Sequence, residues 1–450
     1  MFKIAFRNVL RNGRRSLMTA CAIAVGAIAL ILLGEYTGMA RVGMETGYVE
    51  GMGHLSVFKM GYFEFGSGKP AQYSVSDYDA TIRLIKNDPV LKPMLAVVTP
   101  RVSLGGIAGN AALDKSKTFF ASGFVPSDQD KMNEWNEYQL SGGGGGSEPS
   151  YRKMSDADID HGIVGVGLAR ILGLCKPLKL SDCPAISEPT DKAVIDEPAA
   201  AGERAPRLDL LSGAGGAPNI VAFYVNRAVG QGAREMDDMY VGMNFKLAQQ
   251  LLYGGGEKKA SSIVIQLKRS EDSTAARARL NALFAEKKLD LEVRDFKELA
   301  PQYEQILGYF QSMFVFLGVI MGIIVLFTVA NTMGMSVMER TNEIGTARAM
   351  GVRRGGIRRQ FLLEGAILGA LGATAGNLLS AVLSDWINHA GITYTPPGNA
   401  QPVPLTLLTH GNADLLAGVW LALTVAAALA SIVPANRAAG MKVVDALRHV

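Results

Sequence analysis

The chain has few of the residues from which enzymes and metalloproteins build their sites. It has five histidines in 450 residues, and no two of them stand at the His-x-x-x-His spacing of a helical metal site. Its three cysteines form no Cys-x-x-Cys pair, which excludes the usual structural zinc patterns. The sequence therefore predicts a protein with no metal site, no catalytic residues and no cofactor of its own.

One glycine-rich stretch resembles a phosphate-binding loop but lacks its essential positions. Residues 66–70 read GSGKP, like the end of a Walker A motif. However, Phe63 stands where that motif requires glycine, and Pro70 stands where it requires Ser or Thr to bind magnesium. We therefore do not expect this chain to hydrolyse ATP by itself.

Charge is also scarce. Only 19% of the residues are charged and 48% are hydrophobic, a balance typical of membrane proteins. The basic residues gather at the ends of apolar runs and form no stripe of the kind that binds nucleic acid. A nucleic-acid partner is therefore not expected.

Four uncharged, apolar runs are each long enough to cross a bilayer as a helix. They are Ser16–Gly34, Gln305–Met338, Gly365–Ser384 and Leu415–Asn436. As a helix the second run would reach roughly 50 Å, whereas a hydrocarbon core is about 30 Å thick. The sequence therefore predicts a four-span α-helical membrane protein whose second span continues as a stalk outside the membrane.

The distribution of Lys and Arg predicts the orientation. The first fifteen residues contain five basic residues and no acid, and six arginines follow the second run, whereas residues 386–413 contain neither Lys nor Arg. The positive-inside rule places both termini in the cytoplasm of a bacterium, with the spans in its inner membrane. A cleaved signal peptide is the alternative, but Cys21 lies near the start of the apolar stretch and not after it, which favours an uncleaved span.

These observations predict a series of segments. They are a cytoplasmic amphipathic helix (1–15), span 1 (16–39), a periplasmic α+β domain (40–304), the stalk and span 2 (305–338), a cytoplasmic coupling helix (339–359), span 3 (360–385), a periplasmic loop (386–413), span 4 (414–436) and a cytoplasmic tail (437–450). The opening segment is basic and amphipathic, so it either lies in the headgroup layer or frays as a charged tail.

The large outer domain has alternating strand and helix signals. The predicted strands are 53–59, 96–104, 117–125, 220–226, 261–268 and 289–296. The predicted helices are 76–87, 162–174, 234–253 and 270–288, with Ser76 and Ser270 as N-caps. Residues 126–218 include glycine-rich and proline-rich stretches, which predict an inserted subdomain with flexible loops.

Two local features of this domain carry further predictions. Asp295, with Glu298 three residues later, is expected to cap a helix that leads directly into span 2. Cys175 and Cys183 close a short loop, and a disulfide there would contribute about 2.6 kcal/mol by loop entropy. Two free thiols are the alternative.

The most informative stretch follows span 2. Residues 339–353 read ERTNEIGTARAMGVR, with Ile344, Ala347 and Gly351 on one helical face. The charged residues Glu339, Arg340 and Glu343 are predicted to offer charge to a partner or to headgroups. The stretch resembles the E-R-x-x-E-I-G-x-x-R-A-x-G signature of FtsX-like permeases.

The resemblance extends to the architecture and to the tail, PANRAA at 434–439 and VDALR at 444–448, although Val443 stands where relatives often have proline. It indicates the MacB-type (type VII) ABC transporter permeases, including the LolC/LolE branch. Pro100-Arg101 and residues 121–126 and 165–169 look nearest to that lipoprotein-releasing branch.

The resemblance implies a division of labour. Two permeases, as a homodimer or with a paralogue, would sit on a separate cytoplasmic ATPase dimer that holds ATP and magnesium. ATP-driven closure would be transmitted mechanically to the periplasmic domain, where a carrier, adaptor or lipoprotein would bind. The residues expected to couple to the ATPase are Glu339, Arg340, Glu343, Ile344, Gly345, Arg348 and Gly351.

The resemblance also implies a substrate path between the upper halves of spans 1 and 2. The candidates are Leu32, Leu33, Glu35, Met39, Tyr309, Phe310, Met313 and Phe314. Ordinary helix packing is the alternative for each of them, and Glu35 is expected either to bind a headgroup or to sit in water. The favoured function is extraction or export of lipoproteins or other amphiphiles. The alternatives are efflux through an adaptor and an outer-membrane channel, and a scaffold that controls a cell-wall hydrolase.

Overall fold

The computed structural model describes residues 2–11, 13–66, 68–138, 154–180, 205–213, 218–231, 233–254, 258–395, 403–408 and 412–443. The chain divides into two compact units. The helical unit comprises residues 1–41, 304–392 and 404–450, and the sheet unit comprises residues 42–303 and 393–403. Each is described by itself.

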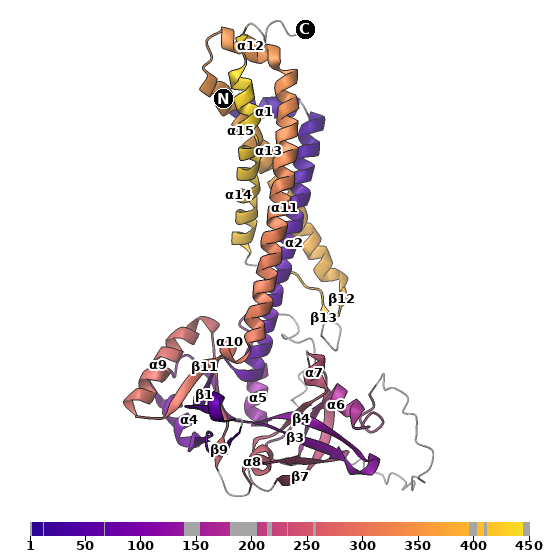
Figure 1. Ribbon diagram of the computed structural model, residues 1–450, viewed down its shortest axis with the longest axis vertical. Coiled ribbons are helices and arrows are strands. Elements are labelled where there is room, and N and C mark those ends of the chain that lie inside the picture. The colour runs from indigo at the N-terminus through magenta and orange to yellow at the C-terminus, as the bar shows by residue number, and fades with distance from the viewer. Residues whose placement is uncertain are drawn as a thin grey trace. The chain divides into compact units, whose positions relative to one another are not determined.

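Four helical segments of the described chain are long and apolar enough to cross a membrane (Figure 1). They are α2 (Gly13–Met52), α11 (Pro301–Glu339), α13 (Arg354–Ala390) and the pair α14 (Ala413–Ala430) and α15 (Ile432–Gly440). The short α1 (Phe2–Arg11) precedes them. This confirms the predicted fold class, a four-span helical protein with a large mixed domain between spans 1 and 2.

Glycines on α13 let its neighbours approach closely. A Cβ added at Gly369 would lie 2.7 Å from the Cβ of Ala427 on α14, and one at Gly372 would lie 2.7 Å from the Cβ of Ile23 on α2. Both distances are too short for real carbon atoms. The small residues of this span therefore serve close helix packing, as expected in a membrane.

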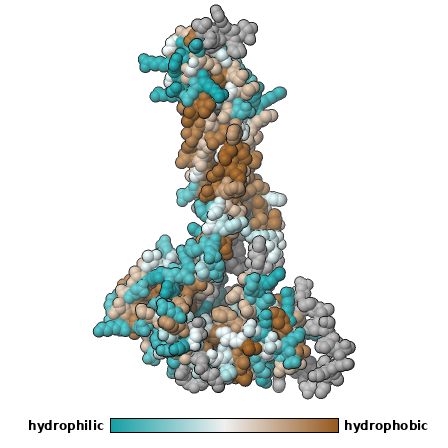
Figure 2. Space-filling model, viewed as in Figure 1, coloured by the Kyte–Doolittle hydropathy of each residue, from teal (hydrophilic) through white to brown (hydrophobic). Residues whose placement is uncertain are grey.

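By contrast, α11 leaves most of its apolar surface uncovered within the chain. Within the chain, only 11% of the most apolar stretch of this helix is buried. The side chains of Phe316 and Phe327 are 67% and 75% exposed. Figure 2 shows the resulting hydrophobic surface on the helical unit. An apolar surface of this extent requires lipid or a protein partner.

The predicted coupling segment 339–359 is not one helix. It consists of α12 (Thr341–Ala349), a turn, and the start of α13 at Arg354. Gly351 has φ 96°, the Val352 N–H donates to the Ala347 carbonyl (3.1 Å) and the Gly351 N–H donates to the Arg348 carbonyl (3.1 Å). These are the bonds of a Schellman motif, which ends a helix at a glycine.

The described part of the sheet unit contains a nine-stranded sheet in the order β11-β1-β10-β3-β4-β8-β5-β7-β6. Because β6 also pairs with β3, the six strands from β3 to β6 in this order form a closed ring. The strands are β1 (Leu55–Lys59), β3 (Leu95–Asn110), β4 (Lys115–Phe124), β5 (His161–Gly165), β6 (Arg207–Ser212), β7 (Asn219–Val229), β8 (Tyr240–Asn244), β10 (Ser262–Leu267) and β11 (Leu291–Asp295). Two short pairs, β2 (Val75–Ser76) with β9 (Lys259–Ala260) and β12 (Thr393–Tyr394) with β13 (Val403–Pro404), lie outside this sheet.

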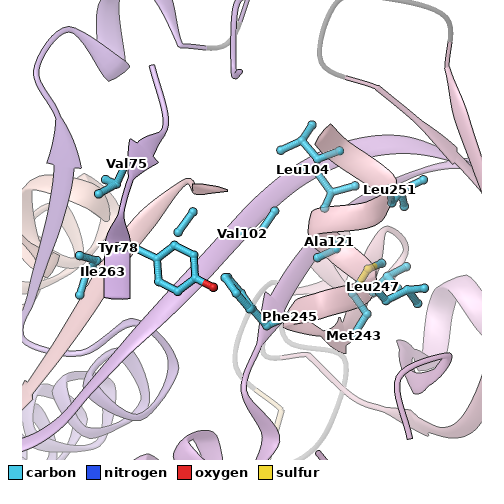
Figure 3. Packing of buried hydrophobic residues seen from close by; sticks show 14 of the residues in the cluster. Val75, Tyr78, Val102, Leu104, Ala121, Met243, Phe245, Leu247, Leu251 and Ile263 are labelled. Atoms are coloured by element: carbon cyan, nitrogen blue, oxygen red, sulfur yellow. The ribbon is translucent and has the colours of Figure 1, made fainter. Parts of the chain in front are cut away.

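Helices cover the sheet and close its core (Figure 1). They are α3 (Tyr62–Phe65), α4 (Tyr78–Asn87), α5 (Pro126–Asn133), α6 (Val166–Ile171), α7 (Arg234–Asp237), α8 (Phe245–Tyr253), α9 (Ser273–Glu286) and α10 (Phe296–Leu299). Figure 3 shows Tyr78 of α4 beside Phe245 of α8, with ring centroids 5.3 Å apart, among side chains of β3 and β4. The six predicted strands are confirmed as β1, β3, β4, β7, β10 and β11, although their ends differ from the predicted ones.

Several sequence predictions for this unit are wrong. Residues 234–253 are not one helix, because all five residues of β8 are buried between β4 and β5, and a fully buried strand lacks the alternation that distinguishes it from a helix. Likewise, residues 162–174 begin with β5 and not with a helix. In the described part of 126–218, β5 and β6 belong to the main sheet, so this segment is not a separate inserted subdomain.

The predicted caps gave mixed results. Asp295 accepts a hydrogen bond from the Lys297 N–H (3.0 Å), so this cap is confirmed, although α10 ends before α11 begins. The prediction that Ser76 is an N-cap is wrong, because the residue before α4 is Asp77, whose backbone lies in the left-handed region (φ 51°). Ser270 begins a short 3-10 turn, and Asp272 occupies the N-cap position of α9.

Buried His54 makes the stability of the sheet unit dependent on pH. Its Nδ1 accepts from the Leu267 N–H (3.0 Å), and burial lowers its pKa from 6.5 to about 4. As pH falls below 6.5 the unfolded chain gains a proton that the folded chain does not bind until about pH 4. We expect a loss of about 3 kcal/mol across this window. Thermal unfolding of the detergent-solubilised chain between pH 7 and pH 4 measures this loss of stability. An equal dependence of stability on pH in His54→Asn would contradict the role given to His54.

Candidate coupling site

A buried ion pair lies at the junction of α11 and α12. The Arg340 guanidinium donates to both oxygens of Glu364 on α13, at 3.1 and 3.0 Å, and the two residues are only 7% and 3% exposed. Asn8 of α1 donates to Glu364 Oε1 (2.6 Å) and Gln360 donates to the same oxygen (3.3 Å). Since the carboxylate is fully bonded, this cluster joins α1, α12 and α13 at one point.

Two more exposed ion pairs surround the buried one. Arg11 of α1 donates to both oxygens of Glu343 (2.7 and 2.9 Å), and Arg15 of α2 lies 2.5 Å from Glu339. The hydrogen bond from Arg11 holds the pKa of Glu343 below its usual range. Because these side chains are about half exposed, each pair contributes little stability. The first joins α12 to α1, and the second joins the end of α11 to the start of α2.

Three other residues of α12 face inward or cap another helix. Ile344 is 5% exposed and Gly345 is buried. Arg348 donates to the carbonyls of Ala439 (2.8 Å) and Met441 (3.3 Å), at the C-terminus of α15. A cation is favourable at a helix C-terminus, so Arg348 ties α12 to the end of the last span.

These contacts correct the sequence interpretation of Arg340. Glu339, Arg340 and Glu343 were expected to offer their charge to a partner or to headgroups, but Arg340 is buried against Glu364. Glu339 and Glu343 pair with Arg15 and Arg11 and stay about half exposed, so their coupling role stays a prediction. Sequence reasoning missed five members of the cluster, which are Asn8, Arg11, Arg15, Gln360 and Glu364. The available signal was Glu364 itself, a lone acid at the border of an uncharged run.

The turn after α12, residues 350–354, faces outward and is named the coupling turn; Thr346 and Ala349 of α12 are also exposed. Met350 is 76% exposed and Val352 is 37% exposed, and Gly351, Arg353 and Arg354 are exposed as well. A Cβ added at Gly351 would meet nothing within 4 Å. The coupling turn thus presents an apolar tip beside two arginines.

The opposite end of α2 is anchored in the sheet unit. Near its C-terminus the Glu50 and Gly51 carbonyls accept from Gln129 (2.8 Å) and Arg101, and the Val49 carbonyl accepts from both the Gly53 N–H (3.0 Å) and Gln266 (3.4 Å). Arg101 also donates to Gln129 Oε1 (2.7 Å), and all three side-chain donors are buried. The first residues of α11 are held similarly, because Tyr303 packs against Phe296 and Tyr48, with centroids 5.3 and 5.8 Å apart.

Only some of the residues predicted to line a substrate path pack against another span. Phe310 packs edge-on against Tyr36 at 5.9 Å, while Tyr309 and Met313 are 63% and 38% exposed. The remaining apolar candidates, Leu32, Leu33, Met39 and Phe314, are half-buried.

Glu35 does not take the place that was predicted for it. It is 3% exposed and accepts a hydrogen bond from Ser384 of α13. It therefore neither sits in water nor faces headgroups, since a carboxyl group within apolar helices needs an internal partner.

Two predictions cannot be read from the described residues. Cys183 and residues 444–448 of the tail lie outside them, so the Cys175–Cys183 disulfide stays a prediction. Within the described ranges no three His, Cys, Asp or Glu side chains gather as metal ligands would.

The fold and site define a multipass membrane protein with a large α/β domain between its first two spans. Residues 315–443 match the family model described as FtsX-like permease C-terminal. This part of the chain is an FtsX-like permease domain, and the resemblance to FtsX-like and MacB-type permeases is confirmed. The narrower placement near the LolC/LolE branch stays a prediction.

Individual proteins show the same similarity. The macrolide export ATP-binding/permease protein MacB of Neisseria gonorrhoeae is 28% identical over 194 residues, which is 43% of this chain and 28% of that protein. An uncharacterised ABC transporter permease of Methanocaldococcus jannaschii, MJ1507, is 23% identical over 85% of this chain and 83% of its own length. The crystal structure of the periplasmic region of MacB from Actinobacillus actinomycetemcomitans aligns with 57% of this chain and 95% of that one, at 12% identity and a TM-score of 0.32.

Proposed function

We propose that this chain is the permease subunit of an ABC transporter and that it transmits work mechanically from a separate ATPase to the sheet unit. The observation that carries the proposal is the anchoring of α2. Its start is tied through Arg15 to Glu339, the last residue of α11 just before α12, and its last carbonyls are held by Arg101, Gln129 and Gln266. A continuous helix held at both ends can transmit displacement along its axis.

The proposed setting follows from the charge distribution. Both termini and α12 lie in the cytoplasm, the sheet unit lies in the periplasm, and the spans cross the bacterial inner membrane. The partner ATPase binds ATP and magnesium and contacts the coupling turn. A second permease copy or a paralogue covers part of the exposed apolar surface of α11.

The contact with the ATPase can be tested at Met350. Met350→Asp places a charge at the apolar tip, so we expect at least a tenfold loss of association with the ABC ATPase that copurifies from native membranes, and a loss of ATPase stimulation. Met350→Leu is the matched control and keeps both. Reversing Glu339 or Glu343 is a poorer test, because it would also break internal ion pairs.

Because Met350 is 76% exposed, the aspartate variant should unfold at the same temperature as the unaltered chain. Normal association and turnover in that folded variant would refute the coupling role of this turn.

For the cargo, we favour lipoproteins or other amphiphiles taken from the inner membrane, through the aromatic contact of Tyr36 with Phe310. The similarity to a protein named for macrolide export supports MacB-like efflux equally. A scaffold that controls a cell-wall hydrolase is the third candidate. Phe310→Asp should block release of a membrane-embedded lipoprotein to a carrier, and unchanged release would remove the first candidate.

A further inference from the structure

A groove lies on the helical unit between α11 and α15, next to the end of α11 that leads into α12. Its volume is about 360 Å³, and α15 contributes Pro434 and Arg437 to it. From α11 it is lined by Asn331, Gly334, Met335 and Met338, among others. This volume is within the range of sites that hold small molecules.

The walls of the groove suit a flexible hydrocarbon chain. Met335 and Met338 are 43% and 71% exposed, and methionine side chains adapt their shape to an apolar ligand. A Cβ added at Gly334 would meet nothing within 4 Å, so the groove is open at its middle. The groove therefore offers continuous apolar contact along more than one turn of α11.

Two polar side chains in the groove have no partner among the residues that the structure describes. Asn331 and Arg437 are exposed, and neither side chain forms a hydrogen bond or ion pair with the residues that the structure describes. An amide on the apolar surface of a span is costly in hydrocarbon unless it is hydrogen-bonded. An arginine near the end of a span can bind a phosphate with two parallel hydrogen bonds.

We propose that this groove binds an anionic phospholipid. The phosphate pairs with the Arg437 guanidinium, the Asn331 amide donates to an ester or glycerol oxygen, and an acyl chain lies against Gly334, Met335 and Met338. Charge complementarity supports this occupant, because Arg437 is the one charged residue among the described residues that line the groove, and it is a cation. The site is separate from the contact with the ATPase and from the cargo path.

Native mass spectrometry of the full chain in detergent tests the site, with phosphatidylglycerol and phosphatidylcholine as probes. We expect preferential retention of phosphatidylglycerol, and about a tenfold weaker retention in Arg437→Gln, because one charge-assisted contact is lost. Gly334→Phe should also abolish retention by filling the groove, without disturbing any packed neighbour. Arg358→Gln, which removes another exposed arginine, is the control and should retain the lipid.

Three outcomes would overturn the proposal. The first is equal retention of both lipids in the unaltered chain and in Arg437→Gln. The second is displacement of the lipid by millimolar inorganic phosphate, which would reveal a simple anion site. The third is efficient disulfide-linked dimer formation by Gly334→Cys in native membranes, which would assign the groove to a second copy of the chain. None of these readouts depends on ATP hydrolysis or on transport.

Discussion

Replacing Glu364 with alanine is expected to lower the free energy of unfolding of the helical unit by about 3–5 kcal/mol, because Arg340 would remain as a buried charge without its carboxylate. Asn8 and Gln360 would lose their acceptor as well. We also expect ATPase stimulation to be lost, since α12 would no longer be held against α1 and α13. Thermal unfolding in detergent and ATPase assays with the copurifying partner measure the two effects.

A double substitution distinguishes the effect of an unpaired buried charge on stability from the effect of lost packing. Arg340→Met combined with Glu364→Leu removes both charges at similar volume, so it should recover most of the stability. If Glu364→Ala unfolds at the same temperature as the unaltered chain, or if the double variant is no more stable than the single one, the buried pair does not have the role assigned to it.

Replacing Arg101 with methionine is expected to release the C-terminal turn of α2 from the sheet unit. The change removes two charge-assisted hydrogen bonds, to the Gly51 carbonyl and to Gln129, at a cost of about 3 kcal/mol. Since the mechanical connection would be loosened while the coupling turn stays intact, we expect ATP hydrolysis to continue and transport to fall. Hydrogen exchange of residues 46–52 should rise in the same variant.

Arg83→Met provides the matched control, because Arg83 is an exposed arginine on α4. It should change neither exchange nor transport. A variant of Arg101 that transports normally, with unchanged protection of the last turn of α2, would contradict the proposed transmission along this helix.

The four spans could be predicted because their signal is local. An uncharged run long enough to cross a bilayer has few alternatives, since buried charges and unpaired backbone groups are costly in lipid. The strands of the sheet unit with β-branched and aromatic residues were also predictable. Three strands of the main sheet were missed. The burial of β5 and β8 on both faces removes the alternating pattern on which a strand prediction depends. β6 does alternate, but it lies in the stretch whose glycine and proline content predicted loops.

The site was predictable in position but not in the direction of its side chains. The signature at 339–353 located α12 and its turn correctly, yet Arg340 is buried against Glu364, and the exposed acids Glu339 and Glu343 pair with Arg15 and Arg11. Glu35, like Arg340, turned inward, to Ser384. Such pairings join residues far apart in the chain, as Asn8 and Glu364 are, and no local pattern encodes them.

The sequence by itself determined how many times this chain can cross a membrane, where its large domain is inserted and which segment follows the second span, because each depends on the hydrophobicity and length of one stretch. Only the tertiary structure decided which charges are used up inside the molecule and which groups remain outward, namely Met350, Asn331 and Arg437. The physical reason is that a charged side chain in a low-dielectric setting takes whichever partner the folded helices bring within hydrogen-bonding distance.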